Sequence, residues 1–139
     1  MEHLCREGLL PRLLFHKYAL EMSNVNNPKA YLAEFIGSVL LVAAIVGSGT
    51  MGTQMSRDSG VGLTLNAISV VAMLWILITT LAPISGAHFN PVVSLVMLYR
   101  KAISTTDALI YIILQILGAI IGATLANLMF ENTLFALSE

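Results

Sequence analysis

The residues best suited to chemistry lie in the turn-rich segment 83–92, PISGAHFNPV. Asn90 followed by Pro91 is typical of a helix start, because Asn caps the first turn and Pro fits the first helical position, where its missing N–H would be unsatisfied anyway. If the Asn90 side-chain oxygen accepts a backbone N–H, its amide nitrogen still has hydrogens to donate. The pattern predicts hydrogen bonding to a neutral molecule. An ordinary capped helix start is the alternative interpretation.

The four residues from Ser85 to His88 are small or turn-forming. We expect them to run extended and to expose backbone carbonyl oxygens as acceptors. A line of acceptors that ends at the Asn90 amide would let a molecule such as water pass by exchanging hydrogen bonds. For His88 alone, a purely structural role is the alternative.

The apolar stretch Val92–Tyr99 follows this loop and stops at Arg100 and Lys101. Eight or nine residues make about 13 Å of helix, which is too short for a hydrocarbon core of about 30 Å. The segment 83–99 is therefore predicted to be re-entrant: a loop that enters the membrane and a half-helix that returns. The positive end of such a half-helix near the midplane would disfavour cations and protons.

The apolar composition of the chain predicts the helices that position this loop. Hydrophobic residues make up 57% of the 139 residues and charged residues 11%, whereas soluble domains carry roughly 25% charged residues. Long apolar blocks predict membrane-spanning helices over 30–51, 61–82 and 107–130. Three glycines are expected to close the first span, with a polar turn over 52–60; they are Gly47, Gly49 and Gly52. The predicted fold class is an all-α membrane protein with three transmembrane helices plus a re-entrant loop with a half-helix.

Composition also excludes several classes of function. The formal net charge of −1 provides no basic field for nucleic acid. The single cysteine, Cys5, permits no internal disulfide and offers no metal cluster. No paired carboxylates, nucleophile–base set or phosphate loop is apparent. We therefore expect no enzyme activity, no cofactor and no metal, and the lipid bilayer as a partner.

The placement of Lys and Arg predicts the topology. The mixed lead 1–29 does not resemble a signal peptide, and Met22 is an alternative start. With three spans, one side of the membrane carries most of the cations, and the other carries only Arg57; the first set is Arg6, Arg12, Lys17, Lys29, Arg100 and Lys101. We expect a multi-pass protein of the plasma (inner) membrane, with a cytoplasmic amino terminus and the tail 131–139 outside.

The loop Ser-Gly-Ala-His-Phe-Asn-Pro-Val (85–92) resembles the first pore loop of the aquaporin or major intrinsic protein family, usually Ser-Gly-Gly/Ala-His-Phe-Asn-Pro-Ala. Ala33-Glu-Phe-Ile-Gly37 resembles the first-helix motif of that family. A third-helix pattern is also similar, in Tyr111, Gln115, Gly118, Ala119 and Gly122. The resemblance covers residues 30 to about 130 and implies the amino-terminal half of an aquaporin-like fold, one three-helix repeat.

The resemblance also implies roles for individual residues. The carbonyl oxygens that would line one half-channel belong to Gly86, Ala87, His88 and Phe89, and the Asn90 amide would donate into it. Val70 would form one wall of the selectivity constriction, although a lone Val in an apolar helix is more simply a packing residue. Glu34 would hold backbone N–H groups of a re-entrant loop that belongs partly to the other repeat. A first-turn carboxylate near the membrane interface is the alternative for Glu34.

Supporting roles fall to five further positions. Pro91 and Gln115 are expected to support the loop, and Val92 stands where the family usually has Ala, so packing or bore is expected to differ. Gly118 and Gly122 form a small-xxx-small pair suited to close helix packing, which could also join copies of the chain.

The predicted function is an aquaporin-like channel half for water or small neutral solutes such as glycerol. The family has two inverted repeats, whereas the sequence contains one; the second Asn-Pro-Ala-type loop and the Arg of the usual constriction are absent. A complementary half-channel or an oligomer of membrane subunits is therefore an expected partner. A non-conducting membrane interaction protein, or a truncated remnant of an aquaporin, is the alternative.

Overall fold

The computed structural model describes residues 27–131, which form four helices joined by short connections. In chain order they are α2 (Pro28–Met55), α3 (Ser59–Ser85), α4 (Pro91–Tyr99) and α5 (Thr105–Met129). Some features named above lie outside these residues and are left as predictions; they are Cys5, the alternative start Met22, the cations Arg6, Arg12 and Lys17, and nearly all of the tail 131–139.

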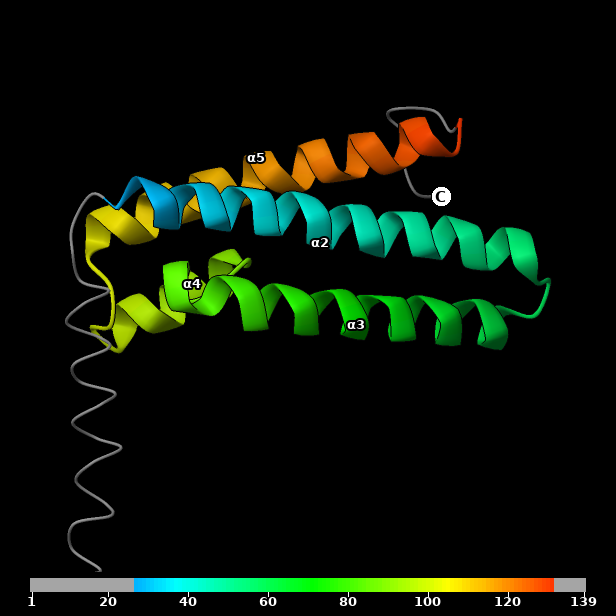
Figure 1. Cartoon of the computed structure of the whole chain (residues 1–139), viewed down its shortest axis with the longest axis horizontal. Helices are drawn as coiled ribbons and strands as arrows, with labels where there is room; N and C mark the ends of the chain where they lie inside the picture. Colours follow the sequence, from blue (N-terminus) through cyan, green and yellow to red (C-terminus); the bar gives the residue numbers. More distant parts are fainter. Residues whose placement is uncertain (1–26, 132–139) are drawn as a thin grey trace, which may run out of the picture.

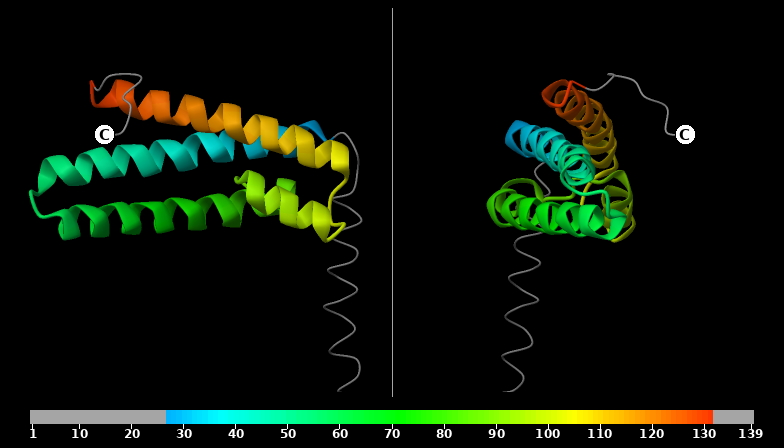
Figure 2. Two further views of the ribbon diagram at one scale, coloured as in Figure 1. Left: turned by 180° about the vertical axis from the view of Figure 1, so that it is seen from behind. Right: turned by 90° about the vertical axis from the view of Figure 1, so that its right-hand side faces the viewer.

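The three long helices lie roughly side by side, with α2 packed against both α3 and α5 (Figure 1). The short α4 packs on α5 and runs toward the end of the molecule where α2 and α5 begin (Figure 2). The α2–α3 turn lies at the opposite end, together with the carboxyl end of α5 (Figure 1). The bundle therefore has one end that contains α4 and another that contains the α2–α3 turn.

Each helix begins at a side-chain cap. Asn27 accepts a hydrogen bond from Lys29 N–H ahead of α2, and Asp58 accepts from Gly60 and Val61 ahead of α3. The Ser104 hydroxyl oxygen accepts from Asp107 N–H ahead of α5. These bonds satisfy N–H groups that have no partner within the helix.

Two of the predicted helix ends are wrong. The helix α2 continues through Gly47, Gly49 and Gly52 to Met55, and α3 continues through Pro83 to Ser85, so the turn between α2 and α3 covers only Ser56–Asp58. An apolar solvent cannot satisfy free backbone groups, so a helix at membrane depth persists through glycine and proline that would end it in water.

The glycines instead serve close packing of the helices. A Cβ on Gly52 would lie 2.8 Å from the Gly62 carbonyl oxygen, where α2 meets α3. A Cβ on Gly118 would lie 2.8 Å from the Phe35 carbonyl oxygen, and one on Gly122 would collide with the Val39 carbonyl, both in α2. Because Gly118 and Gly122 are buried within the chain, the expectation that they could join two copies is wrong.

The outward faces of the bundle are apolar. Trp75 of α3 is 70% exposed, and many other large apolar side chains are also exposed; examples are Leu32, Leu63, Val71, Leu109, Ile113 and Met129. Each of α2, α3 and α5 is long and apolar enough to cross a membrane. The buried side chains, in contrast, include an unusual share of polar groups.

Candidate functional site

Glu34 is the centre of the buried polar groups and is itself fully buried in α2. Its Oε1 accepts hydrogen bonds from the Ser85 hydroxyl at 2.6 Å and from His88 N–H at 2.9 Å. Its Oε2 accepts from Phe89 N–H at 2.7 Å and from the Gln115 amide at 2.8 Å. All four partners donate, which matches the acceptor capacity of a carboxylate. Glu34 thus joins α2, the loop 86–90 and α5 at one point.

A second group of hydrogen bonds extends from Gln115 to the loop. The Gln115 amide nitrogen also donates to the Ser94 hydroxyl oxygen at 3.0 Å, and Ser94 Oγ lies 3.1 Å from His88 Nδ1. The Tyr111 hydroxyl donates to the Ser85 carbonyl oxygen at 2.9 Å, and its ring meets the His88 ring edge to face at 5.3 Å. The His88 side chain is therefore held in the core by both α4 and α5.

The loop between α3 and α4 is tightly turned, and the expectation that residues 85–88 run extended is wrong. Gly86, Ala87 and Phe89 all have positive φ, at 90°, 52° and 48°. The reason is visible in the hydrogen bonds: one carboxylate, that of Glu34, receives two consecutive backbone N–H groups, so the chain must curl around it. Positive φ is costly for residues with a side chain, and it persists where surrounding contacts determine it.

Phe89 adds an apolar contact to this anchoring. Its ring occupies the space that a side chain would need at Gly37 of α2, and Phe89 is only 7% exposed. Gly37 is the last residue of the Ala33–Gly37 motif, so the motif provides both the carboxylate and the space for the aromatic ring.

Asn90 caps α4 as the sequence predicts, with its Oδ1 accepting from Val92 N–H at 2.8 Å. The residue is exposed, and among residues 27–131 its amide nitrogen makes no hydrogen bond. Pro91 is the first residue of α4, and Val92 is 65% exposed beside it. The amide donors of Asn90 and the Val92 side chain therefore lie on a free surface.

Val70 does not lie next to the loop between α3 and α4. It is a half-buried residue of α3, fifteen residues before the end of that helix, or about 22 Å along its axis. Its assignment to a constriction stays a prediction.

No role was predicted from the sequence for the side chains of Ser85 and Ser94, although both are fully buried and hydrogen-bonded within the site. A signal for Ser94 exists: it is the one polar residue before Tyr99 in the otherwise apolar helix PVVSLVMLY. A polar group at membrane depth needs a partner inside the protein, so an isolated serine in such a helix indicates a buried contact.

A second polar contact lies where α2 and α5 begin. The Tyr31 hydroxyl donates to Asp107 Oδ1 at 2.6 Å, and the Ser104 hydroxyl donates to Asp107 Oδ2 at 2.6 Å. The Tyr31 ring also meets the Tyr111 ring edge to face at 6.0 Å. This group fixes the start of α2 against the start of α5, next to the residues that hold the loop.

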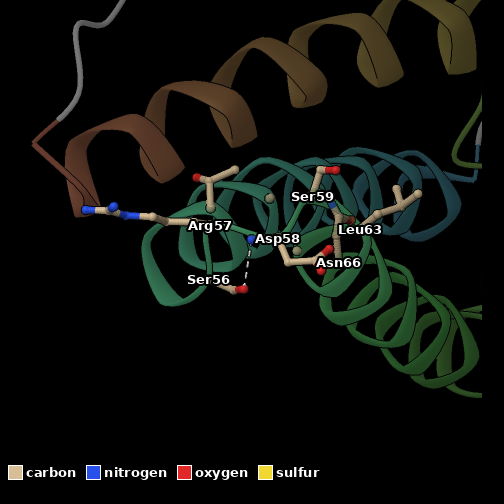
Figure 3. Close-up of a pocket in the computed structure, with 9 residues that line it drawn as sticks. Ser56, Arg57, Asp58, Ser59, Leu63 and Asn66 are labelled. Atoms are coloured by element: carbon tan, nitrogen blue, oxygen red, sulfur yellow. Dashed lines mark hydrogen bonds between the residues drawn. The ribbon is translucent and has the colours of Figure 1, made fainter.

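A pocket of about 490 Å³ opens at the far end of the molecule, around the α2–α3 turn. Figure 3 shows Arg57 extending away from the other labelled side chains, while Ser56 Oγ accepts a hydrogen bond from Asp58 N–H. None of the predicted site residues lines this pocket. The buried polar groups around Glu34, rather than the hollow, are therefore the candidate site.

The fold and this site define an all-α membrane protein that has three helices able to span a bilayer and a short fourth helix introduced by an anchored loop. The model of the family described as "Major intrinsic protein" matches residues 21–138. The chain belongs to this family. The family comprises channels for water and glycerol, not enzymes, so the chain is a multi-pass membrane protein in contact with the lipid bilayer.

Three relatives illustrate the match. Aquaglyceroporin AqpS of Rhizobium meliloti (strain 1021) is 47% identical over 100 residues, covering 72% of this chain and 43% of the relative. Probable aquaporin PIP2-2 of Oryza sativa subsp. japonica is 35% identical, covering 78% and 40%. Glycerol uptake facilitator protein-like 6 of Lactiplantibacillus plantarum is 38% identical, covering 68% and 41%.

The chain thus spans well under half the length of each of these relatives. No solved structure matches it.

Proposed function

We propose that this chain supplies one half of a channel for water or small uncharged solutes such as glycerol, completed by a second, inverted three-helix repeat. The observation that carries the proposal is that the loop before α4 is anchored on one side and exposes hydrogen-bond donors on the other. Four hydrogen bonds to Glu34 fix its surroundings, while the Asn90 amide donors are left exposed at the start of α4. The names of the relatives, aquaglyceroporin, aquaporin and glycerol uptake facilitator, support this class of solute.

In this proposal the segment 83–99 is re-entrant. The helix α4 has nine residues, too few to cross a hydrocarbon core of about 30 Å. Its start would lie near the midplane, where the positive end of a helix disfavours cations while the Asn90 amide donates to a neutral solute. The residues that would line the half-channel are Gly86, Ala87, His88, Phe89 and Asn90, with Val70 at a constriction.

The geometry requires only that the second repeat be inverted, whether it is joined in one polypeptide or separate. Two half-helices that meet from opposite faces of the membrane belong to repeats of opposite orientation. The exposed face of α4 includes Val92, Leu95 and Val96, each more than half exposed, and would be covered by that repeat.

We further propose that the amino terminus faces the cytoplasm of a plasma (inner) membrane, because Lys29, Arg100 and Lys101 would then lie on the cytoplasmic side and only Arg57 on the other. A topology reporter fused after Glu139 is expected to read outside, and one fused after Lys101 is expected to read cytoplasmic. A cytoplasmic signal at both positions would contradict three spans.

The substitution Asn90→Asp tests the role of the amide. Asp is as good a helix cap as Asn, so α4 should keep its start. Replacing the donors with an acceptor-only carboxylate removes about 1 kcal/mol of hydrogen bonding to the solute, and flux through a complete assembly should fall about fivefold or more. Flux is measured by light scattering of proteoliposomes under an osmotic gradient.

Asn127→Asp provides the matched control, since Asn127 is a half-buried residue near the end of α5, outside the loop. The control should conduct like the unmodified chain. Equal flux from Asn90→Asp and the control, with equal insertion, would remove the role assigned to Asn90. Absence of flux from every form, including the unmodified chain with a second repeat, would favour a non-conducting membrane interaction protein or a remnant.

A further inference from the structure

A series of buried hydrogen bonds connects Glu34 through Gln115 and Ser94 to the His88 ring, and the donor of each bond can be identified. The first donor to assign is Gln115, whose amide group could face Glu34 with either its oxygen or its nitrogen. A carboxylate only accepts, so the group that lies 2.8 Å from Glu34 Oε2 must be the nitrogen. The second hydrogen of that nitrogen points to Ser94 Oγ at 3.0 Å.

Ser94 Oγ therefore accepts from Gln115, and its own single hydrogen is available for one other acceptor. Two acceptors are within reach. His88 Nδ1 lies at 3.1 Å, whereas Gln115 Oε1 lies at 3.5 Å, beyond the usual range of O–H donors. The better partner is His88 Nδ1, which can accept only if it has no proton.

The remaining ring nitrogen of His88, Nε2, is not completely enclosed by the described residues. Among residues 27–131, the one buried side-chain N or O atom without a hydrogen-bond partner is Ser38 Oγ. His88 Nε2 has no partner among those residues either, so it is not one of the buried atoms. The ring is otherwise enclosed, with His88 only 5% exposed and packed on Tyr111.

We propose that Ser94 is a positioning residue that holds neutral His88 as its Nε2–H tautomer, so that the loop presents a second outward donor two residues before Asn90. The ligand it suits is the acceptor oxygen of a small neutral solute. That consequence rests on the proposed function, whereas the tautomer itself does not. In this series the Glu34 carboxylate fixes the orientation of the Gln115 amide, Gln115 fixes that of the Ser94 hydroxyl, and Ser94 determines which ring nitrogen of His88 carries the proton.

The tautomer is measured by nitrogen-15 NMR of the full chain in lipid bilayers, with His3 and His16 replaced by Gln so that His88 is the one histidine. An unprotonated ring nitrogen resonates far downfield of a protonated one. We expect Nδ1 to be unprotonated and Nε2 protonated. A protonated Nδ1 would overturn the assignment, and it would do so whether or not the chain forms a channel.

Two variants of Ser94 distinguish a hydrogen-bonding role, which orients His88, from a role in packing alone. Ser94→Thr keeps the hydroxyl and should keep the Nε2–H tautomer, whereas Ser94→Ala leaves Nδ1 without a donor and should yield a mixture of both tautomers. Both are compared at equal helix content and membrane insertion. An unchanged tautomer in Ser94→Ala would overturn the role of Ser94.

The consequence for transport is measured in the same assembly as Asn90→Asp. Flux should fall severalfold in Ser94→Ala and be restored in Ser94→Thr. If Asn90→Asp reduces flux while Ser94→Ala changes the tautomer and not the flux, the donor role of His88 is wrong and the proposed function stands. If neither variant changes flux, the donor roles of both Asn90 and His88 are wrong; if the complete assembly conducts no solute, the proposed function fails.

Discussion

The two polar interruptions in this bundle are built in opposite ways. In the α2–α3 turn, the side-chain bonds of Ser56 and Asp58 reach residues two or three positions away and are exposed. In the loop before α4, the bonds of Glu34 reach residues 51 to 81 positions away and are buried. A turn of the first kind is specified by its own residues, whereas the loop is specified by other helices.

This difference determines what each region can do. A local turn at the end of two helices connects them, and its polar groups can bond to water. The backbone groups of the loop that face Glu34 and Tyr111 are buried, so they need partners inside the protein. Because Glu34 and Tyr111 provide those partners, the Asn90 amide can be left free.

Glu34→Ala is the strongest test of this contrast. It leaves four donors without an acceptor in a buried site, and each such loss costs about 1–3 kcal/mol. With partial relaxation, the free energy of unfolding should fall by about 3 kcal/mol or more. The measurement is reversible unfolding in mixed detergent, followed by helix content.

Asp58→Ala is the matched change in the α2–α3 turn, where an acidic side chain also accepts two backbone N–H groups. Its loss should cost about 1 kcal/mol, the usual value for a helix cap. Similar costs for the two variants would mean that the Glu34 bonds stabilise no more than an exposed cap.

A smaller effect is expected from Gly122→Ala. The added methyl group would meet the Val39 carbonyl, which belongs to the backbone of α2 and can move only with that helix. Overpacking of this kind costs about 1–3 kcal/mol, and the separation of α2 from α5 should weaken the Glu34–Gln115 bond as well.

Gly47→Ala is the control for that substitution, since a Cβ there would lie 3.5 Å from the Phe130 ring, an ordinary contact. Ala is the better helix former, so Gly47→Ala should be neutral or stabilise by up to about 1 kcal/mol. Equal destabilisation by both variants would show that the glycines act through helix propensity rather than through packing of α2 on α5.

Much of the fold could be predicted from the sequence because apolar runs and caps are local signals. The three long helices, the short helix after Asn90-Pro91 and the Asn90 cap all follow from residue type and spacing. The ends of α2 and α3 could not be predicted in the same way, because glycine and proline have different effects in lipid from those in water.

The site was less predictable because its geometry depends on contacts between distant helices. The family resemblance implied that Glu34 would hold backbone N–H groups, yet it assigned part of the loop to another repeat, whereas Glu34 here accepts from His88 and Phe89 of its own repeat. The positive φ of Ala87 and Phe89 has no local sequence signal, since neither is glycine. The position of Ser94 in an apolar helix indicates a buried contact, but its partner Gln115 becomes known only when α5 packs against α4.

The central claim is that this repeat conducts only when an inverted repeat completes it. The most direct measurement is solute flux in proteoliposomes that contain the chain alone or together with a complementary second repeat. Orientation is determined in parallel by labelling Ser59→Cys and Thr105→Cys, each at the first residue of a helix at opposite ends of the bundle, with Cys5 replaced. We predict one dominant orientation, little flux from the chain alone and clear flux with the partner. Strong flux from the chain alone in a single orientation would contradict the account.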